Sequence, residues 1–349
     1  YNYSGVFLNP IRTWISDASG DWDDGTRWED ALIPNHNERT AIFGSAITSP
    51  QLIFTNSAVT VKNVTFDNAN TYAIAGAGSV TLDAATVSAG VNVLQGTHEF
   101  QIAVNLGTTT TVDVASGGSL AFKNALNLNG NTLTKTGLGD LLISNSQGSG
   151  GGSIVVTAGT LGGSGTVGGD LTNSNSTVAP GNSAGTLSVS GNYLQTAGTL
   201  AIEIGGLLGG EFDVLDIAGT ATLGGILDIS LLSFAPSPDD SFTVLSAALG
   251  ITDNGMTLTG DMANDFSMSL GNGGTELILT FQATGPAGDF DLNGTVDGAD
   301  FLLWQRDQNV GDLADWEANY GATSAVSSVA AVPEPVSASL LVMALGTLA

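Results

Sequence analysis

A short word, Ala-Gly-Thr-Leu, recurs along the middle of the chain. In each copy small turn residues precede a strand-forming residue, and the runs around the copies alternate apolar and polar residues between Gly, Asn or Ser. No stretch before about residue 290 has a convincing helical period. Such a pattern predicts stacked β coils, with glycine at the corners and Leu or Val inside. The word stands at Ala158–Leu161, Ala184–Leu187 and Ala197–Leu200.

The composition narrows the classes of function. The 349 residues include 33 Asp and Glu but only 7 Lys and Arg, so the formal net charge is -26. Such a chain repels phosphate backbones, which argues against a nucleic-acid partner, and attracts divalent cations. Without cysteine it has no disulfides or thiolate metal sites. Hydrophobic residues make up 42% of the chain, which favours packed short strands over a disordered polar chain.

Two stretches carry a family resemblance. "TWISDASGDWDDGTRWEDALIPN" at Thr13–Asn35 and "LTKTGLGDLLISNS" at Leu133–Ser146 resemble the autotransporter-associated β-strand repeat proteins, which occur in planctomycete and other bacterial surface proteins. The resemblance covers roughly residues 13–281 and implies an all-β fold, a right-handed parallel β-helix or β-solenoid. We expect an aromatic N-terminal cap at 1–40, solenoid repeats at 41–230 and closing strands at 231–283.

Aspartates are regularly spaced in "GDFDLNGTVDGADF", Gly288–Phe301. Counted from the first aspartate, oxygen donors stand at positions one, three, five, seven, nine and twelve, and Gly294 at position six permits a sharp turn. This pattern predicts a Ca²⁺ site, with a dissociation constant on the order of 10⁻⁴ to 10⁻³ M. The alternative is a polar turn that binds nothing. The predicted ligands are Asp289, Asp291, Asn293, Thr295 through its carbonyl, Asp297 and Asp300.

Aromatic residues follow this loop at helical spacing. Phe301 and Trp304 are three apart, and Trp316 and Tyr320 four apart, which predicts two helices around a small aromatic core. The arrangement resembles the dockerin type I module, which we place at 284–323 as a small α-helical calcium-loop module. The resemblance implies a cohesin-like or envelope protein as partner. The second copy, "RDQNVGDLADW", lacks the donor series, so we expect one Ca²⁺ rather than two.

The C-terminal segment, 324–349, changes composition again. A Ser, Ala and Val linker leads to Val332, Pro333, Glu334 and Pro335, and an apolar run follows. This order resembles the PEP-CTERM sorting signal and implies export, transient membrane insertion of a hydrophobic tail and an exosortase-type processing enzyme. The terminal basic cluster of that signal is absent, so we expect a truncated signal in a fragment or processed form. The alternative is an ordinary hydrophobic helix.

Candidate catalytic groups are few. His36 lies in a polar turn and His98 at a strand edge, and we expect both at the surface. Cations are too scarce in the solenoid to suit acidic sugars. A glycosidase needs two facing carboxylates, and the available acids are Glu203, Glu211, Asp213, Asp216 and Asp228. The alternation of "EFDVLDIAGTATLGG", residues 211–225, predicts a half-exposed strand whose acids are solvated on its polar face.

The sequence therefore predicts a non-catalytic protein of the cell surface or extracellular matrix. Its solenoid would be a spacer or adhesin, and its calcium module a docking element or a structural staple. One alternative is a protein that binds or degrades polysaccharide and is targeted by the dockerin-like module. Another is a structural component whose coils stack end to end.

Overall fold

The computed structural model describes residues 10–144, 150–282, 285–291, 293–308 and 310–323. Contacts divide the chain into two units, Tyr1–Gln282 and Ala283–Ala349. The sorting motif at Val332, Pro333, Glu334 and Pro335 lies outside the described residues. Within the described part, no helix has the length and apolar character needed to cross a membrane.

The described part of the first unit is mostly β, with one sheet of 23 strands and a second of six. The larger sheet consists of β1 (Ile11–Thr13), β2 (Gly20–Asp21), β3 (His36–Phe43), β4 (Gln51–Phe54), β5 (Ala58–Asp67), β6 (Tyr72–Ala75), β7 (Ser79–Leu82), β8 (Ala89–Gln95), β9 (Thr97–Phe100), β10 (Ala103–Leu106), β11 (Thr110–Val114), β12 (Ser119–Phe122), β13 (Leu126–Asn127), β14 (Thr132–Thr136), β15 (Asp140–Ile143), β16 (Ser153–Val156), β17 (Thr160–Gly163), β19 (Asp170–Pro180), β21 (Tyr193–Ile204), β23 (Ala221–Leu223), β24 (Ile226–Leu231), β26 (Ile251–Asp253) and β27 (Thr257–Gly260).

The described residues of this unit also form the smaller sheet and three short 3-10 helices. The sheet contains β18 (Thr166–Val167), β20 (Thr186–Val189), β22 (Val214–Ile217), β25 (Ser241–Ala247), β28 (Phe266–Gly271) and β29 (Glu276–Phe281). The helices are η1 (Gly25–Arg27), η2 (Glu29–Ala31) and η3 (Ala263–Asp265).

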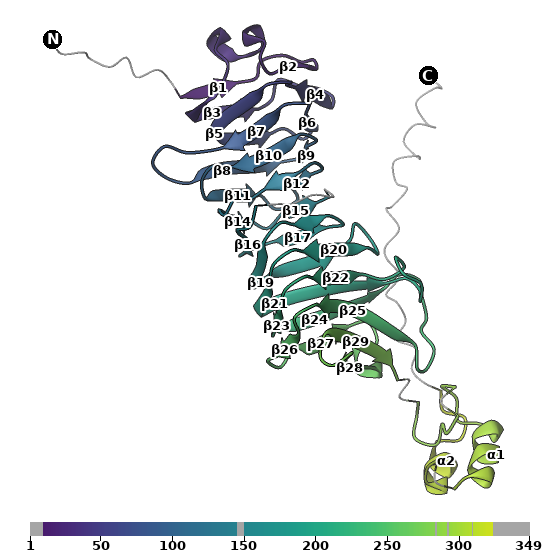
Figure 1. The fold of residues 1–349 in the computed structure, drawn as a ribbon. Coiled ribbons are helices and arrows are strands. Elements are labelled where there is room, and N and C mark those ends of the chain that lie inside the picture. Colours follow the sequence, from purple (N-terminus) through teal and green to yellow (C-terminus); the bar gives the residue numbers. More distant parts are fainter. Residues whose placement is uncertain (1–9, 145–149, 283–284, 292, 309, 324–349) are drawn as a thin grey trace, which may run out of the picture. The chain divides into compact units, whose positions relative to one another are not determined.

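Strands of successive coils pair in parallel and in register. Ser119 of β12 pairs with Thr97 of β9 on one side and with Asp140 of β15 on the other. Figure 1 shows β9, β12, β15 and β17 one below another. Side chains also connect the coils: Asn127 Nδ2 donates to Asn105 Oδ1, 22 residues earlier, at 2.8 Å. The prediction of a large parallel β architecture is confirmed, and it is consistent with a β-solenoid. We call this unit the β stack.

Alternating burial explains why these sequences form the β stack. Leu120, Leu141 and Leu161 are in register and fully buried, while the residues that precede them, Ser119, Asp140 and Thr160, are more exposed. Burying one such side chain contributes about 1.5–3 kcal/mol. Glycine is required where coils approach closely at a corner. Gly163 has φ +108°, and a Cβ there would lie 2.2 Å from the carbonyl oxygen of Ile143.

Aromatic side chains fill the N-terminal end of the β stack. Trp14, Trp22 and Trp28 are buried around Phe43. The Trp14 and Trp28 ring centroids lie 5.3 Å apart, and Trp22 and Phe43 are separated by 5.4 Å. Their segments also pair with the sheet, β1 with β3 and β2 with β4. These rings cover an interior that the first coil would otherwise leave open.

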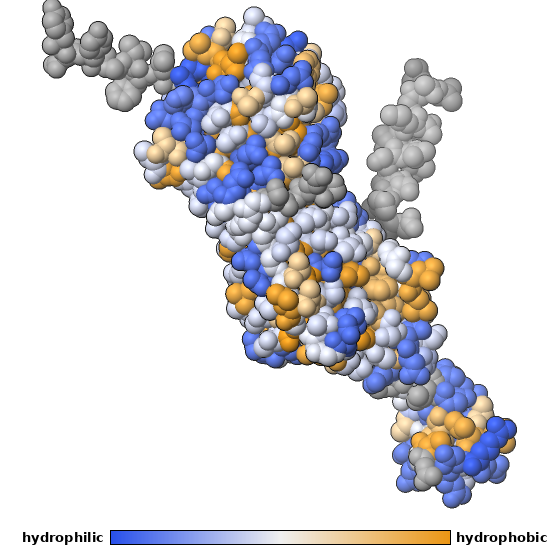
Figure 2. Space-filling model, viewed as in Figure 1, coloured by the Kyte–Doolittle hydropathy of each residue, from blue (hydrophilic) through white to orange (hydrophobic). Residues whose placement is uncertain are grey.

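At the other end, the strand direction changes. β25 follows the parallel β22 but pairs antiparallel with β29, and β28 also pairs antiparallel with β29. The outer surface is mixed. On the face in Figure 2, hydrophilic and intermediate side chains predominate, with apolar groups gathered more densely over its lower part. The exposed apolar residues of the β stack include Leu207 and Leu208.

Two predictions of surface exposure are wrong. His98 is fully buried, because β9 places it in the inward row beside Leu120. Its Nδ1 accepts a hydrogen bond from the Tyr72 amide at 3.1 Å, so Nε2 carries the proton and donates to the Gln95 carbonyl at 2.9 Å. Burial lowers the pKa of His98. Asp213 is 1% exposed rather than solvated, whereas Asp216 is exposed as predicted.

Candidate metal centre

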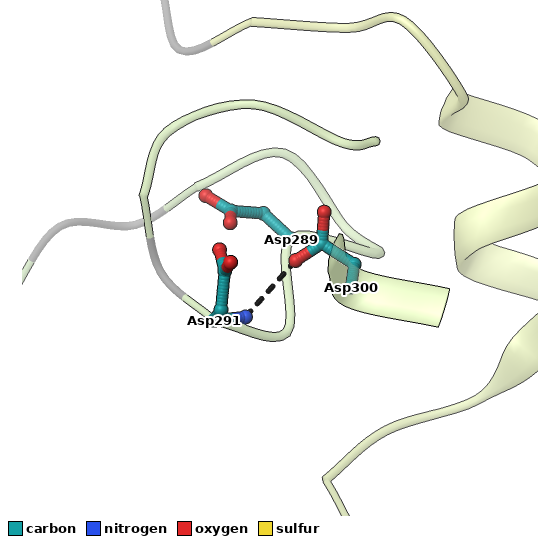
Figure 3. A group of neighbouring side chains, drawn as sticks. All are labelled: Asp289, Asp291 and Asp300. Carbon is teal, nitrogen blue, oxygen red and sulfur yellow. Dashed lines mark hydrogen bonds between the residues drawn. The ribbon is translucent and has the colours of Figure 1, made fainter. Parts of the chain in front are cut away.

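Three carboxylates of the second unit meet in one loop. Asp289, Asp291 and Asp300 each offer an oxygen, and these atoms all lie within 4.8 Å of one another. Figure 3 shows the three side chains gathered around one space. Asp289 and Asp300 are buried, while Asp291 is exposed. Carboxylate oxygens alone form a donor set suited to a hard divalent cation.

The Asp289 carboxylate accepts hydrogen bonds from backbone amides in the first half of the loop. Its Oδ1 accepts from the amide of Asn293 at 3.0 Å, and its Oδ2 accepts from the amide of Gly294 at 2.7 Å. Gly294 has φ +85°, a conformation that favours glycine, as predicted for the sixth position. Burial raises the pKa of Asp289, and the carboxylates of Asp300 and Asp291 add to the rise. A bound cation would relieve that repulsion.

Asp300 connects the two ends of the loop. Its Oδ1 accepts from the amide of Asp291 at 3.0 Å, and its Oδ2 accepts from the amide of Asp297 at 2.8 Å. Burial opposes ionisation of Asp300, but the hydrogen bonds from backbone amides outweigh it and lower its pKa. Asp300 also lies in the first turn of α1 (Gly298–Arg306), where the helix dipole favours a negative charge.

The other three predicted ligands shape the loop. Asp297 is the N-cap of α1, and its Oδ1 accepts from the amide of Ala299 at 2.7 Å. Asn293 Oδ1 accepts from the amide of Thr295 at 2.9 Å, and its Nδ2 donates to Asp291 Oδ2 at 3.0 Å. Thr295 forms an antiparallel bridge with Thr323. The structure thus brings three of the six predicted residues into the carboxylate cluster and gives the others local backbone contacts.

A row of aromatic rings packs beside the loop. Phe301 of α1 lies 4.9 Å from Trp316 of α2 (Leu313–Asn319), measured between ring centroids, and Trp316 lies 5.0 Å from Tyr320. The predicted contacts form, but the rings are only partly enclosed, and Tyr320 is 63% exposed. One further contact has no signal in the spacing of the residues. Trp316 Nε1 donates to the Asp297 carbonyl at 2.6 Å and connects α2 to the loop.

No protein-family model matches this chain, and comparison with curated proteins gives no significant match.

Proposed function

We propose that the chain is a non-catalytic, exported protein of the cell surface or extracellular matrix. Its β stack is a right-handed β-helix that acts as a spacer or adhesin. Its second unit is a dockerin-like module that binds one Ca²⁺ and attaches the protein to a cohesin-like or other envelope protein. Export and envelope sorting rest on the resemblance of residues 332–335 and the following apolar run to the PEP-CTERM signal.

The observation that carries the proposal is the convergence of Asp289, Asp291 and Asp300 within 4.8 Å. These are positions one, three and twelve of the calcium-loop pattern. Two of the carboxylates are already held by backbone amides, so the loop needs little rearrangement to enclose a cation. Three clustered carboxylates repel one another, and Ca²⁺ removes that repulsion while accepting all three as ligands.

A docking role makes capture dependent on Ca²⁺. The test immobilises the full chain, passes envelope extract of a bacterium that carries it over the resin in millimolar Ca²⁺, and elutes with chelator. We expect a defined protein that wild type retains and the double variant Asp289→Asn, Asp291→Asn does not. Asp312→Asn is the matched control, because Asp312 caps α2 and asparagine caps equally well.

Two results separate docking from stapling. Docking is supported if wild type and the Asp312→Asn control retain a protein that the double variant does not, and if chelator releases that protein. If wild type binds Ca²⁺ but retains no protein that the double variant loses, the site is a structural staple within its own unit. Equal retention by all three chains would contradict a calcium-dependent attachment.

A further inference from the structure

A groove crosses the outer face of the β stack, outside the unit that holds the carboxylate cluster. Its volume is about 670 Å³. It passes over β9, β12, β15 and β17, which lie one below another in Figure 1, and continues over β19 and β21. Neighbouring strands are about 4.8 Å apart. The groove therefore offers similar positions repeated along the stack, at a spacing comparable with one sugar ring of an extended glycan.

Small residues make the floor of this groove. Gly162 pairs with Leu142 on one side and with Ala179 on the other, and Ala121 and Ala201 occupy outward positions of β12 and β21. Their strand neighbours point inward and are buried, so the floor lies directly on the closed core of the β stack. A row of hydroxyl and carboxylate groups borders the floor in register: Thr97, Ser119, Asp140 and Thr160.

One end of the groove contains an acceptor without a donor. Oε2 of Glu203 is buried and has no hydrogen-bond partner among the described residues. The backbone beside it is fixed, because Asp213 Oδ2 accepts from the Glu203 amide at 2.9 Å and Asp213 Oδ1 accepts from the Gly185 amide at 2.8 Å. A buried acceptor left unpaired costs free energy. Glu203 lines the groove, so rotation of its carboxylate toward the groove would let a hydroxyl donor from a ligand recover that cost.

The charge and the backbone pairing of the groove decide the class of ligand. The described lining residues include four acids, Glu99, Asp140, Glu203 and Asp213, and one cation, Lys123, which is paired with Glu99. This balance disfavours polyanions. The floor strands are hydrogen-bonded to neighbours on both sides, so the floor has no free sheet edge for an extended peptide to join.

We propose that this groove binds a neutral glycan chain lying along the stack, with Glu203 accepting a hydrogen bond from a sugar hydroxyl. The site is separate from the proposed calcium module and does not depend on it. None of the described lining residues is aromatic. Because sugar stacking on an aromatic ring is absent, we expect weak binding, with a dissociation constant on the order of 1 mM.

The test measures binding of the full chain to neutral hexasaccharides of β-1,4-linked glucose, xylose and mannose by saturation-transfer NMR. Polygalacturonate is the anionic comparison. At least one neutral chain should bind, equally in Ca²⁺ and in chelator, and polygalacturonate should not. Failure of all three neutral chains to bind would overturn the proposal. The calcium proposal would be unaffected, because its readout is separate.

Variants locate the site. Ala201→Trp fills the groove from the floor and should abolish binding. Thr81→Trp is the control, because Thr81 also points outward, between the buried Val80 and Leu82, but does not line the groove. Glu203→Gln keeps the side-chain shape and should weaken binding roughly tenfold. Wild-type binding by Ala201→Trp or by Glu203→Gln would contradict the assigned site, and melting curves verify that each variant is folded.

Discussion

Asp300 accepts a hydrogen bond from the backbone amide of Asp291, nine residues earlier, at 3.0 Å (Figure 3). This contact holds the last position of the loop beside the third. The second carboxylate oxygen of Asp300 accepts from the Asp297 amide, which ties the cluster to the start of α1. The same side chain therefore closes the loop, completes the capping box at the start of α1 and contributes an oxygen to the carboxylate cluster.

Calcium should make the second unit slower to exchange its amide hydrogens. At a tenfold excess over the dissociation constant, bound Ca²⁺ stabilises the folded unit by about 1.4 kcal/mol. Hydrogen-exchange mass spectrometry of the full chain should show roughly tenfold slower exchange in 285–323 with Ca²⁺ than with chelator, and no change in the β stack. The Asp289→Asn, Asp291→Asn variant should lose the difference. A calcium effect spread equally over the β stack would contradict a local site.

His98 should make the β stack sensitive to acid. The pKa of His98 in the folded chain is lowered below the ordinary value of 6.5. Just below pH 6.5, the histidine is therefore protonated in the unfolded chain but still neutral in the folded chain. The contribution of neutral His98 to the free energy of unfolding is fully present above pH 6.5. It is lost as the pH falls toward the pKa of His98 in the folded chain. We expect the free energy of unfolding to drop by up to about 1.4 kcal/mol per pH unit in that window.

Replacing His98 with leucine separates this effect from other titrations. Leucine matches Leu120, the residue in register on β12, but leaves the Tyr72 amide without its acceptor at every pH. The variant should therefore have a pH-independent cost and a flatter melting profile than wild type between pH 7 and 5. His36→Gln, at an exposed position, is the control. Parallel profiles for wild type and His98→Leu would refute the prediction.

Asp213 should give the stability of the β stack the opposite pH dependence to that of His98. Burial raises the pKa of Asp213 to about 7, against the two amide hydrogen bonds that lower it. Between the unfolded value of 3.8 and about 7, the folded chain holds a proton that the unfolded chain has released. Stability from this group is therefore present at low pH and lost as the pH rises through 7.

The measurement is the difference in melting temperature between wild type and Asp213→Asn from pH 5 to 8. We expect the melting temperature of wild type to fall relative to that of Asp213→Asn as the pH rises, because only wild type must ionise a buried carboxyl. Asp216→Asn, at an exposed position three residues later, should show no such trend. If wild type instead gains advantage with rising pH, the amide hydrogen bonds outweigh burial.

The local pattern was sufficient to predict stacked β coils, and the family resemblance implied their parallel pairing. Small turn residues followed by alternating apolar and polar residues recur many times along the chain. A wrong assignment of one such repeat therefore does not change the predicted fold. Single positions are harder. A shift of one residue moves a side chain to the other face of a strand. His98 lies two residues before Phe100, so the alternation of β9 places both in the inward row. The prediction of a surface position followed the polarity of the imidazole instead of this alternation.

Asp213 and the predicted ligands of the loop show a second limit of prediction from sequence. The partners of Asp213 are the amides of Gly185 and Glu203, which lie 28 and 10 residues away. The spacing of residues near Asp213 therefore does not predict its burial. In the predicted calcium loop, the spacing of oxygen-bearing residues identified three that do meet, Asp289, Asp291 and Asp300. It did not separate these from Asp297, whose carboxylate accepts from the backbone at the start of α1.

The most direct test of the central claim is a calorimetric titration of Ca²⁺ into the full chain, beside the Asp289→Asn, Asp291→Asn variant and the Asp312→Asn control. The account predicts one specific site in wild type and control, with a dissociation constant on the order of 10⁻⁴ to 10⁻³ M. The double variant should bind at least tenfold more weakly, because it loses two of three carboxylates. Identical titrations for wild type and the double variant would show that these aspartates do not bind calcium.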